Sequence, residues 1–233
     1  AAPEEGVRVS ATRTTTLPGF DGAALAVHEV GEADARPVLL LHGLFSSAEV
    51  NWIKYGHAAT IAARGFRVIM PDFRVHGASA APHDAAAYPP QVLVRDVLAL
   101  IEAMGLTDFD LGGFSLGART VAALLVEGVR PRRAILAGMG LEGLSGWTDR
   151  RQFFLDAIAL RETVTRDDSH FMAVMFMRTM KIDPVAATLL LEAGSDIDMA
   201  ALVAADVPVA VICGDEDQDN GSAPALARQL AQG

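Results

Sequence analysis

The sequence has 233 residues, of which 51% are hydrophobic, and its formal net charge is −10. This length suits one domain with a large apolar core. The acidic balance argues against a nucleic acid or an anionic membrane surface as partner, and no apolar stretch approaches the roughly 18 to 20 residues of a membrane helix.

The first predicted elements are two strands, residues 7–17 and 25–30, joined as a hairpin by the turn residues 18–22. Beyond them, short continuous apolar runs alternate with helical patterns. Runs of this kind are typical of strands buried on both faces of a sheet. The strand-like runs are residues 37–41, 66–70, 108–114, 133–139 and 207–213, and the helical patterns are residues 52–64, 91–104 and 116–127. We therefore expect a mostly parallel sheet covered by helices on both faces.

This alternation is interrupted from residue 141 to residue 206, where helix-forming residues predominate. We expect a helical cap that roofs the carboxyl ends of the strands, where substrate pockets of open α/β sheets lie. Residues 1–140 and 207–233 would then form the two parts of the α/β core. The predicted apolar wall of the pocket consists of Phe45, Phe171, Met172, Met175 and Phe176, although such methionines also commonly fill a helical core.

Ser115 lies in a G-x-S-x-G pentapeptide, residues 113–117, between a strand-like run and a helical pattern. A serine at such a turn adopts strained backbone geometry, and flanking glycines leave room for it. The pattern predicts a nucleophile elbow, in which the serine hydroxyl is exposed and the N–H of Leu116 can stabilise an oxyanion. The alternative is a glycine-rich turn with a solvated serine.

A second loop contributes to the same predicted site. The run 37–41 is followed by His42, Gly43, Leu44 and Phe45. The glycine permits a sharp turn that leaves the N–H of Leu44 free as the second oxyanion donor. We expect His42 to brace this loop by hydrogen bonding rather than to act as a base.

Four segments, LHGLF, PDFRVHGAS, GGFSLGA and VAVICGDED, occur in an order and spacing that resemble the α/β-hydrolase superfamily. The resemblance covers almost the whole chain outside the insertion. It implies the α/β-hydrolase fold with a helical cap. It also implies a structural rather than a catalytic role for Asp72, Arg74 and His76, which order a loop in such proteins.

The resemblance maps the orienting carboxylate of a catalytic triad onto Asp217, after the run 207–213. A buried carboxylate there would hold the imidazole of the base in its correct tautomer. Asp215, Glu216 and Asp219 are rival candidates, and a solvated acidic loop is the alternative.

In this fold the triad follows the order serine, acid, histidine. None of the histidines at positions 28, 42, 57, 76, 83 and 170 follows Asp217. We therefore expect the base histidine beyond residue 233, together with a last strand and helix that the sequence lacks.

These features predict a serine hydrolase that cleaves an ester or similar acyl bond through an acyl-enzyme. A serine at the elbow argues against the haloalkane dehalogenase and epoxide hydrolase branches, which need a carboxylate nucleophile. The same triad serves carbon–carbon bond hydrolases and cofactor-free perhydrolases, and a non-catalytic ligand-binding protein of the same fold is the alternative from another class.

The expected partner is a small, apolar ester, with no cofactor, no metal, no nucleic acid and no membrane involved. A single cysteine, Cys213, excludes an internal disulfide and favours a reducing, cytoplasmic location, although disulfide-free secreted enzymes exist. The sequence does not determine the oligomeric state.

Overall fold

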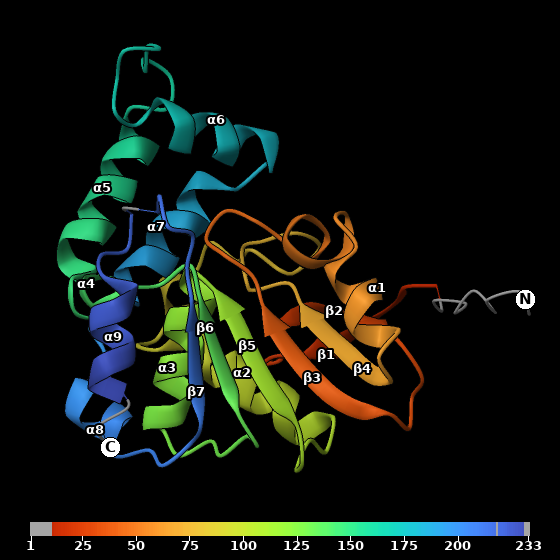
Figure 1. Ribbon diagram of the computed structural model, residues 1–233. Coiled ribbons are helices and arrows are strands. Elements are labelled where there is room, and N and C mark those ends of the chain that lie inside the picture. Colours follow the sequence, from red (N-terminus) through yellow and green to blue (C-terminus); the bar gives the residue numbers. More distant parts are fainter. Residues whose placement is uncertain (1–10, 218, 231–233) are drawn as a thin grey trace, which may run out of the picture.

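The computed structural model describes residues 11–217 and 219–230, which form a seven-stranded sheet in the order β1-β2-β4-β3-β5-β6-β7 (Figure 1). The first two strands form the predicted antiparallel hairpin, of which residues 7–10 lie outside the described part. β2 pairs antiparallel with β4, and the remaining pairs are parallel. The strands are β1 (Arg13–Pro18), β2 (Ala24–Val30), β3 (Arg36–Leu41), β4 (Phe66–Pro71), β5 (Asp110–Phe114), β6 (Ala134–Ala137) and β7 (Val209–Ile212).

Helices connect the strands where the apolar periodicity predicted them. The expected helix over residues 52–64 is divided into a π-helical turn, η1 (Glu49–Ile53), and α1 (His57–Ala62), and a short 3-10 turn, η2 (Ala85–Ala87), precedes α2. The other helices are α2 (Val92–Ala103), α3 (Leu116–Val126), α4 (Leu141–Ser145), α5 (Trp147–Ala159), α6 (Phe171–Thr179), α7 (Pro184–Glu192), α8 (Met199–Val203) and α9 (Ala223–Leu230). Helix α3 is central, because residues 117–125 are all buried and it packs on β3, β5 and β6.

The expectation that every core strand is buried on both faces is wrong for β6 and β7. Ile135 on β6 is 37% exposed and Ile212 on β7 is 56% exposed. The helices η1 and α1 do not cover this outward face, because they pack with the apolar residues of β2, β3 and β4. On this face, the described helices therefore cover only one half of the sheet, whereas α2, α3, α8 and α9 lie on the other face.

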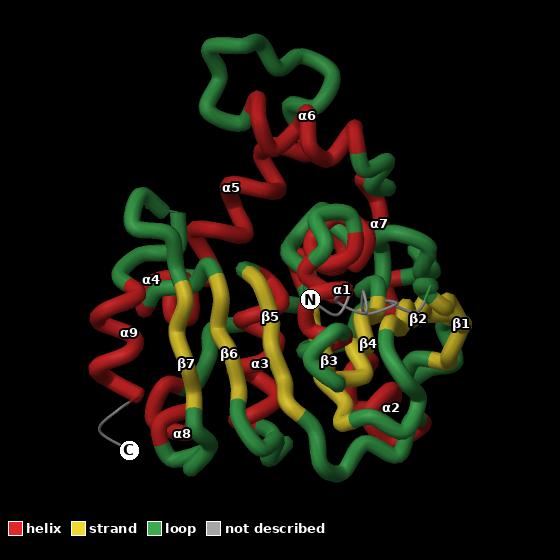
Figure 2. The backbone as a smooth tube through the Cα atoms, turned by 45° about the vertical axis from the view of Figure 1, so that its right-hand side comes forward, coloured by secondary structure: helices red, strands yellow, loops and turns green. Residues whose placement is uncertain are grey.

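The insertion is helical, and no strand lies between β6 and β7 in the described structure. Helices α5, α6 and α7 rise beyond the carboxyl ends of the strands, and a long loop joins α5 to α6 (Figure 2). Helix α8 differs, because it contacts α3 and α9 near the opposite end of the sheet. Within the predicted cap of residues 141–206, α8 therefore packs with the core, and its apolar residues gave no signal of which layer they join.

No helix within the described ranges is long and apolar enough to cross a membrane.

Candidate active site

Strand register brings the predicted site residues to one edge of the sheet. Leu41 of β3 is paired with Gly113 of β5, so the loop at residues 42–45 and the turn at Ser115 emerge side by side. Phe114 is paired with Ala137, which is paired in turn with Ile212. The loop that carries Asp217 therefore leaves the same edge as Ser115, with β6 between the two.

Ser115 has the backbone geometry of a nucleophile elbow. Its φ is 51° and its ψ is −111°, a conformation that a non-glycine residue rarely adopts and that costs about 1–3 kcal/mol. The surrounding structure fixes it: the Ser115 N–H donates to the Ala137 carbonyl at 2.9 Å, and the Arg119 N–H donates to the Ser115 carbonyl at 3.0 Å. The side chain remains partly exposed.

Both flanking glycines are required by close packing of the backbone. A Cβ on Gly113 would lie 2.3 Å from the carbonyl of Gly117, and a Cβ on Gly117 would lie 2.1 Å from the carbonyl oxygen of Leu41. No side chain fits at either position. The glycines of the pentapeptide thus allow α3 to begin directly against β3 and β5.

The two predicted oxyanion donors are free. In the loop after β3, the Gly43 N–H donates to Asn51 Oδ1 at 2.8 Å and the Phe45 N–H donates to His76 Nε2 at 2.9 Å. Between them, the Leu44 N–H has no acceptor in the described structure, and neither has the Leu116 N–H in the first turn of α3. Unpaired amides beside an exposed serine are what an oxyanion hole needs.

His42 and His76 brace this loop and are not bases. Each Nε2 accepts a backbone N–H, from Phe73 in the case of His42 and from Phe45 in the case of His76. Each Nδ1 must therefore carry the proton, and it donates to the carbonyl of Gly43 or of Arg74. Burial lowers the pKa of His42 to about 4 and that of His76 to about 3. Both rings are neutral and have no free lone pair.

Asp72 and Arg74 are structural as well. The Asp72 carboxylate accepts the N–H groups of Ala48 and Ala78 and bonds His28 at 3.2 Å. Burial raises the pKa of Asp72, but these hydrogen bonds outweigh it, so the net shift is downward. Arg74 is fully buried and donates to Asp21 and Asp96. These contacts agree with the structural role that the sequence suggested.

Asp217 is the least exposed of the four acids after β7, since Asp215, Glu216 and Asp219 are all exposed. Its Oδ1 accepts the Asp219 N–H at 2.9 Å, and its Oδ2 lies 3.5 Å from the Cys213 thiol. Burial and this carboxylate together raise the pKa of Cys213. The catalytic role of Asp217 remains a prediction.

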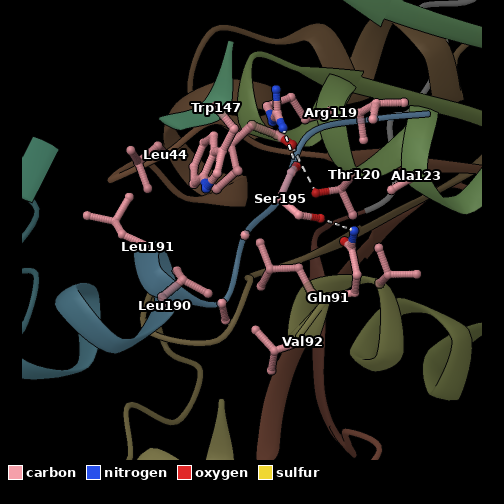
Figure 3. A pocket seen from close by; sticks show the side chains of 16 residues that line it. Leu44, Gln91, Val92, Arg119, Thr120, Ala123, Trp147, Leu190, Leu191 and Ser195 are labelled. Carbon is pink, nitrogen blue, oxygen red and sulfur yellow. Dashed lines mark hydrogen bonds between the residues drawn. The ribbon is translucent and has the colours of Figure 1, made fainter. Parts of the chain in front are cut away.

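A cavity of about 50 Å³ lies between the cap and helices α2 and α3 (Figure 3). Leu44 and Leu116, the two predicted oxyanion residues, contribute to its wall. The rest is mainly apolar and comes from α2, α3 and the cap, including Val92, Ala123, Trp147, Leu190, Leu191 and Ile197.

The predicted pocket residues Phe45, Phe171, Met172, Met175 and Phe176 do not line this cavity. Phe45 is buried against Phe154 and His76, while Met172 on α6 is 74% exposed. Their role in binding a substrate stays a prediction, and composition does not reveal which helix of the insertion faces the core. The cap residues that line the cavity come from the start of α5, from α7 and from the segment 193–197.

None of the histidines is placed as a base for Ser115. His28 bonds Asp72 and Thr14, His83 lies 3.0 Å from Asp183, and His170 lies 2.8 Å from Asp168. His57 is exposed at the start of α1. No group of three or more His, Cys, Asp or Glu residues that could hold a metal occurs among the described residues.

Three polar residues of the site were not predicted from the sequence: Arg119, Asn51 and Asn220. Asn51 orients the loop after β3, as described above, and Asn220 donates from Nδ2 to the Gly138 carbonyl at 2.9 Å. Arg119 was detectable, since it is the one charged residue within the apolar helix α3. A charge on a fully buried helix needs specific partners.

Comparison with known proteins agrees with this architecture. The sequence profile of the alpha/beta hydrolase fold matches residues 36–134. An esterase from Exiguobacterium antarcticum is 18% identical, and the alignment covers 94% of this chain and 88% of that one with a TM-score of 0.72. The structure therefore has the α/β-hydrolase fold.

Relatives in sequence match less than half of the chain. An epoxide hydrolase from Caballeronia sordidicola is 37% identical over 98 residues, which are 42% of this chain and 28% of that protein. A 1H-3-hydroxy-4-oxoquinoline 2,4-dioxygenase from Pseudomonas putida is 32% identical over 97 residues, 42% of this chain and 34% of that protein. The matches thus span about a third or less of these relatives.

Proposed function

We propose that the protein is a serine hydrolase that cleaves an ester or similar acyl bond through an acyl-enzyme. The observation that carries the proposal is the partly exposed, strained Ser115 beside two unpaired amides, those of Leu44 and Leu116. Ser115 is the nucleophile, these amides form the oxyanion hole, and Asp217 orients the base. None of the six described histidines is suitably placed as the base, so the proposal assigns this role to a histidine that is not among them.

The proposed reaction has two halves. Ser115 Oγ attacks the acyl carbon while the histidine takes its proton, and the N–H groups of Leu44 and Leu116 bind the oxyanion that forms. The histidine then returns the proton to the departing alcohol. Water deacylates the serine by the same steps, and each oxyanion donor contributes about 3–4 kcal/mol to the transition state.

Ser115 argues against the activity named for the relative from Caballeronia sordidicola. An epoxide hydrolase of this fold needs a carboxylate nucleophile, and the elbow here offers a hydroxyl. Carbon–carbon bond hydrolysis and cofactor-free perhydrolysis use the same triad and remain alternative activities of the proposed site. Esterase chemistry is supported by the name of the structural neighbour from Exiguobacterium antarcticum.

The proposed substrate is a small molecule with a modest apolar acyl group. The cavity beside Leu44 and Leu116 is lined mainly by leucine, valine, alanine and isoleucine side chains, and no acidic residue lines it.

A fluorophosphonate probe tests the proposal in the natural protein. Peptide mapping should find the label on Ser115, and Ser115→Ala should lose both the label and turnover of p-nitrophenyl acetate, by about 10⁶ in kcat. A folded protein that is neither labelled nor active would instead be a ligand-binding member of the superfamily. Activity of Ser115→Ala within tenfold of the wild type would contradict the serine mechanism.

A further inference from the structure

Arg119 lies one helical turn after Ser115 on α3 and points into the base of the cap. It is 6% exposed. Its Nη1 donates to the carbonyls of Gly143 and Leu144 in α4, and its Nη2 donates to the Ser195 carbonyl at 2.6 Å. The guanidinium also stacks on Trp147, with its centre 4.7 Å from the ring (Figure 3). Arg119 thus joins the nucleophile helix to both ends of the cap.

Burying the charged guanidinium of Arg119 costs desolvation free energy. No carboxylate in the described structure lies within 4.0 Å of it, and the charge of Asp196 only partly offsets the effect of burial on its pKa. Burial lowers its pKa to about 10, so the side chain remains protonated at neutral pH. An apolar side chain of similar size would pack between α3 and the cap without this desolvation cost. The cation is therefore best explained by what its hydrogen bonds hold in place.

On its other side, α4 is bonded to the loop that carries Asp217. The Gly143 N–H donates to the Asn220 carbonyl at 2.9 Å, and the Leu141 N–H donates to the Ser222 carbonyl at 3.2 Å. In return, the Ser222 N–H donates to Glu142 Oε2 at 2.7 Å. Gly143 therefore links the two sides directly: its carbonyl accepts from Arg119, and its N–H donates to Asn220.

The packing between α4 and this loop leaves no free space. A Cβ on Gly140 would lie 2.3 Å from the backbone carbonyl of Gly221. Arg150 of α5 adds a further bond, from Nη1 to the Asp219 carbonyl at 2.7 Å. A displacement of α4 would therefore displace the loop as well.

We propose that Arg119 is a positioning residue of the active site: it holds α4 against α3 and thereby sets where the Asp217 loop stands relative to Ser115. This inference rests on the proposed function for its kinetic consequence. Its structural part, the coupling of Arg119 to the loop, can be measured without any activity.

The reactivity of Cys213 reports on the loop directly. It is the only cysteine in the sequence, it is partly buried, and its thiol faces Asp217. Arg119→Met keeps an unbranched side chain under Trp147 but removes every donor. We expect Arg119→Met to raise the rate of Cys213 modification by a disulfide reagent about tenfold, and Arg119→Lys to raise it less. Peptide mapping assigns the modified site.

The matched control is Arg130→Met. Arg130 also donates to backbone carbonyls, those of Leu125 and Val129, but at the far end of α3. Arg130→Met should leave the rate of Cys213 modification unchanged. An unchanged rate in folded Arg119→Met, or an equal rise in Arg130→Met, would overturn the proposal. If Arg119→Met does not fold, the same comparison is made with Arg119→Lys.

Kinetics then tests the consequence for the site. Arg119→Met should lower kcat for p-nitrophenyl acetate about tenfold while KM changes less than about twofold, because alignment matters mainly in the transition state. Asn220→Ala acts on the same loop. The double variant, Arg119→Met with Asn220→Ala, should therefore have a kcat no lower than that of the less active single variant. A product of both losses, or a rise in KM alone, would overturn the positioning role. Absence of fluorophosphonate labelling in the wild type would instead contradict the proposed function and leave the Cys213 result intact.

Discussion

Gly117 stands directly against Leu41, so that a Cβ on Gly117 would lie 2.1 Å from the Leu41 carbonyl oxygen. The start of α3 is thereby fixed on the end of β3, and the loop with the Leu44 amide follows that strand after His42 and Gly43. One close backbone contact thus sets the distance between both proposed oxyanion donors. It also explains why the pentapeptide ends in glycine.

We expect Gly117→Ala to destabilise the fold by about 3 kcal/mol, the upper range for overpacking, because the atoms in the way belong to the backbone. Chemical denaturation measures the change. Gly214→Ala is the matched control, since its Cβ would have nothing closer than 3.9 Å. If both variants changed the free energy of unfolding equally, the contact between Gly117 and Leu41 would not be the cause.

The backbone strain at Ser115 predicts that a variant that relieves it is more stable but inactive. Because its φ is 51°, Ser115→Gly should relieve strain and raise the free energy of unfolding by about 1 kcal/mol, while abolishing the proposed turnover. Ser115→Ala keeps the Cβ and should show no such gain. Thermal and chemical unfolding of the two variants give the comparison. A Ser115→Gly variant no more stable than Ser115→Ala would show that the backbone of Ser115 is unstrained.

Two buried histidines predict a loss of stability in acid. Burial lowers the pKa of His42 to about 4 and that of His76 to about 3, against about 6.5 in an unfolded chain. Below pH 6.5 the unfolded state therefore binds more protons, and stability falls as the pH drops towards these values. The slope is about 1.4 kcal/mol per pH unit for each histidine, and above pH 6.5 neither contributes a slope.

Denaturant unfolding between pH 6.0 and 4.5 measures this slope. His76→Gln should remove about half of the slope that the two buried histidines produce. His57→Gln, at an exposed position, should leave the slope unchanged. Equal slopes in the wild type and His76→Gln would mean that His76 is already protonated in the folded protein.

Much of the core was predictable because its signals are local. The apolar runs predicted β3 to β7, and the pentapeptide around Ser115 predicted a turn whose geometry depends on residues close in sequence. The role of α8 and the pocket wall were not predictable, since helical periodicity does not say which neighbour a helix packs on. Arg119 shows the same limit: its charge stands out on α3, but its carbonyl partners lie 24, 25 and 76 residues away.

The cavity beside Leu44 and Leu116 predicts which cap residues control substrate choice. Leu190 of α7 lines it and is 5% exposed, whereas Met172 of α6 does not line it. Leu190→Ala should enlarge the cavity and raise the ratio of kcat/KM for p-nitrophenyl hexanoate to that for the acetate by about tenfold. Met172→Ala, the matched control, should leave the ratio unchanged. Since a buried Leu→Ala change costs about 2–5 kcal/mol, Leu190→Val serves as a milder variant with the same direction of change. If the ratio changed in Met172→Ala and stayed the same in the Leu190 variants, the acyl group would lie against α6 and away from this cavity.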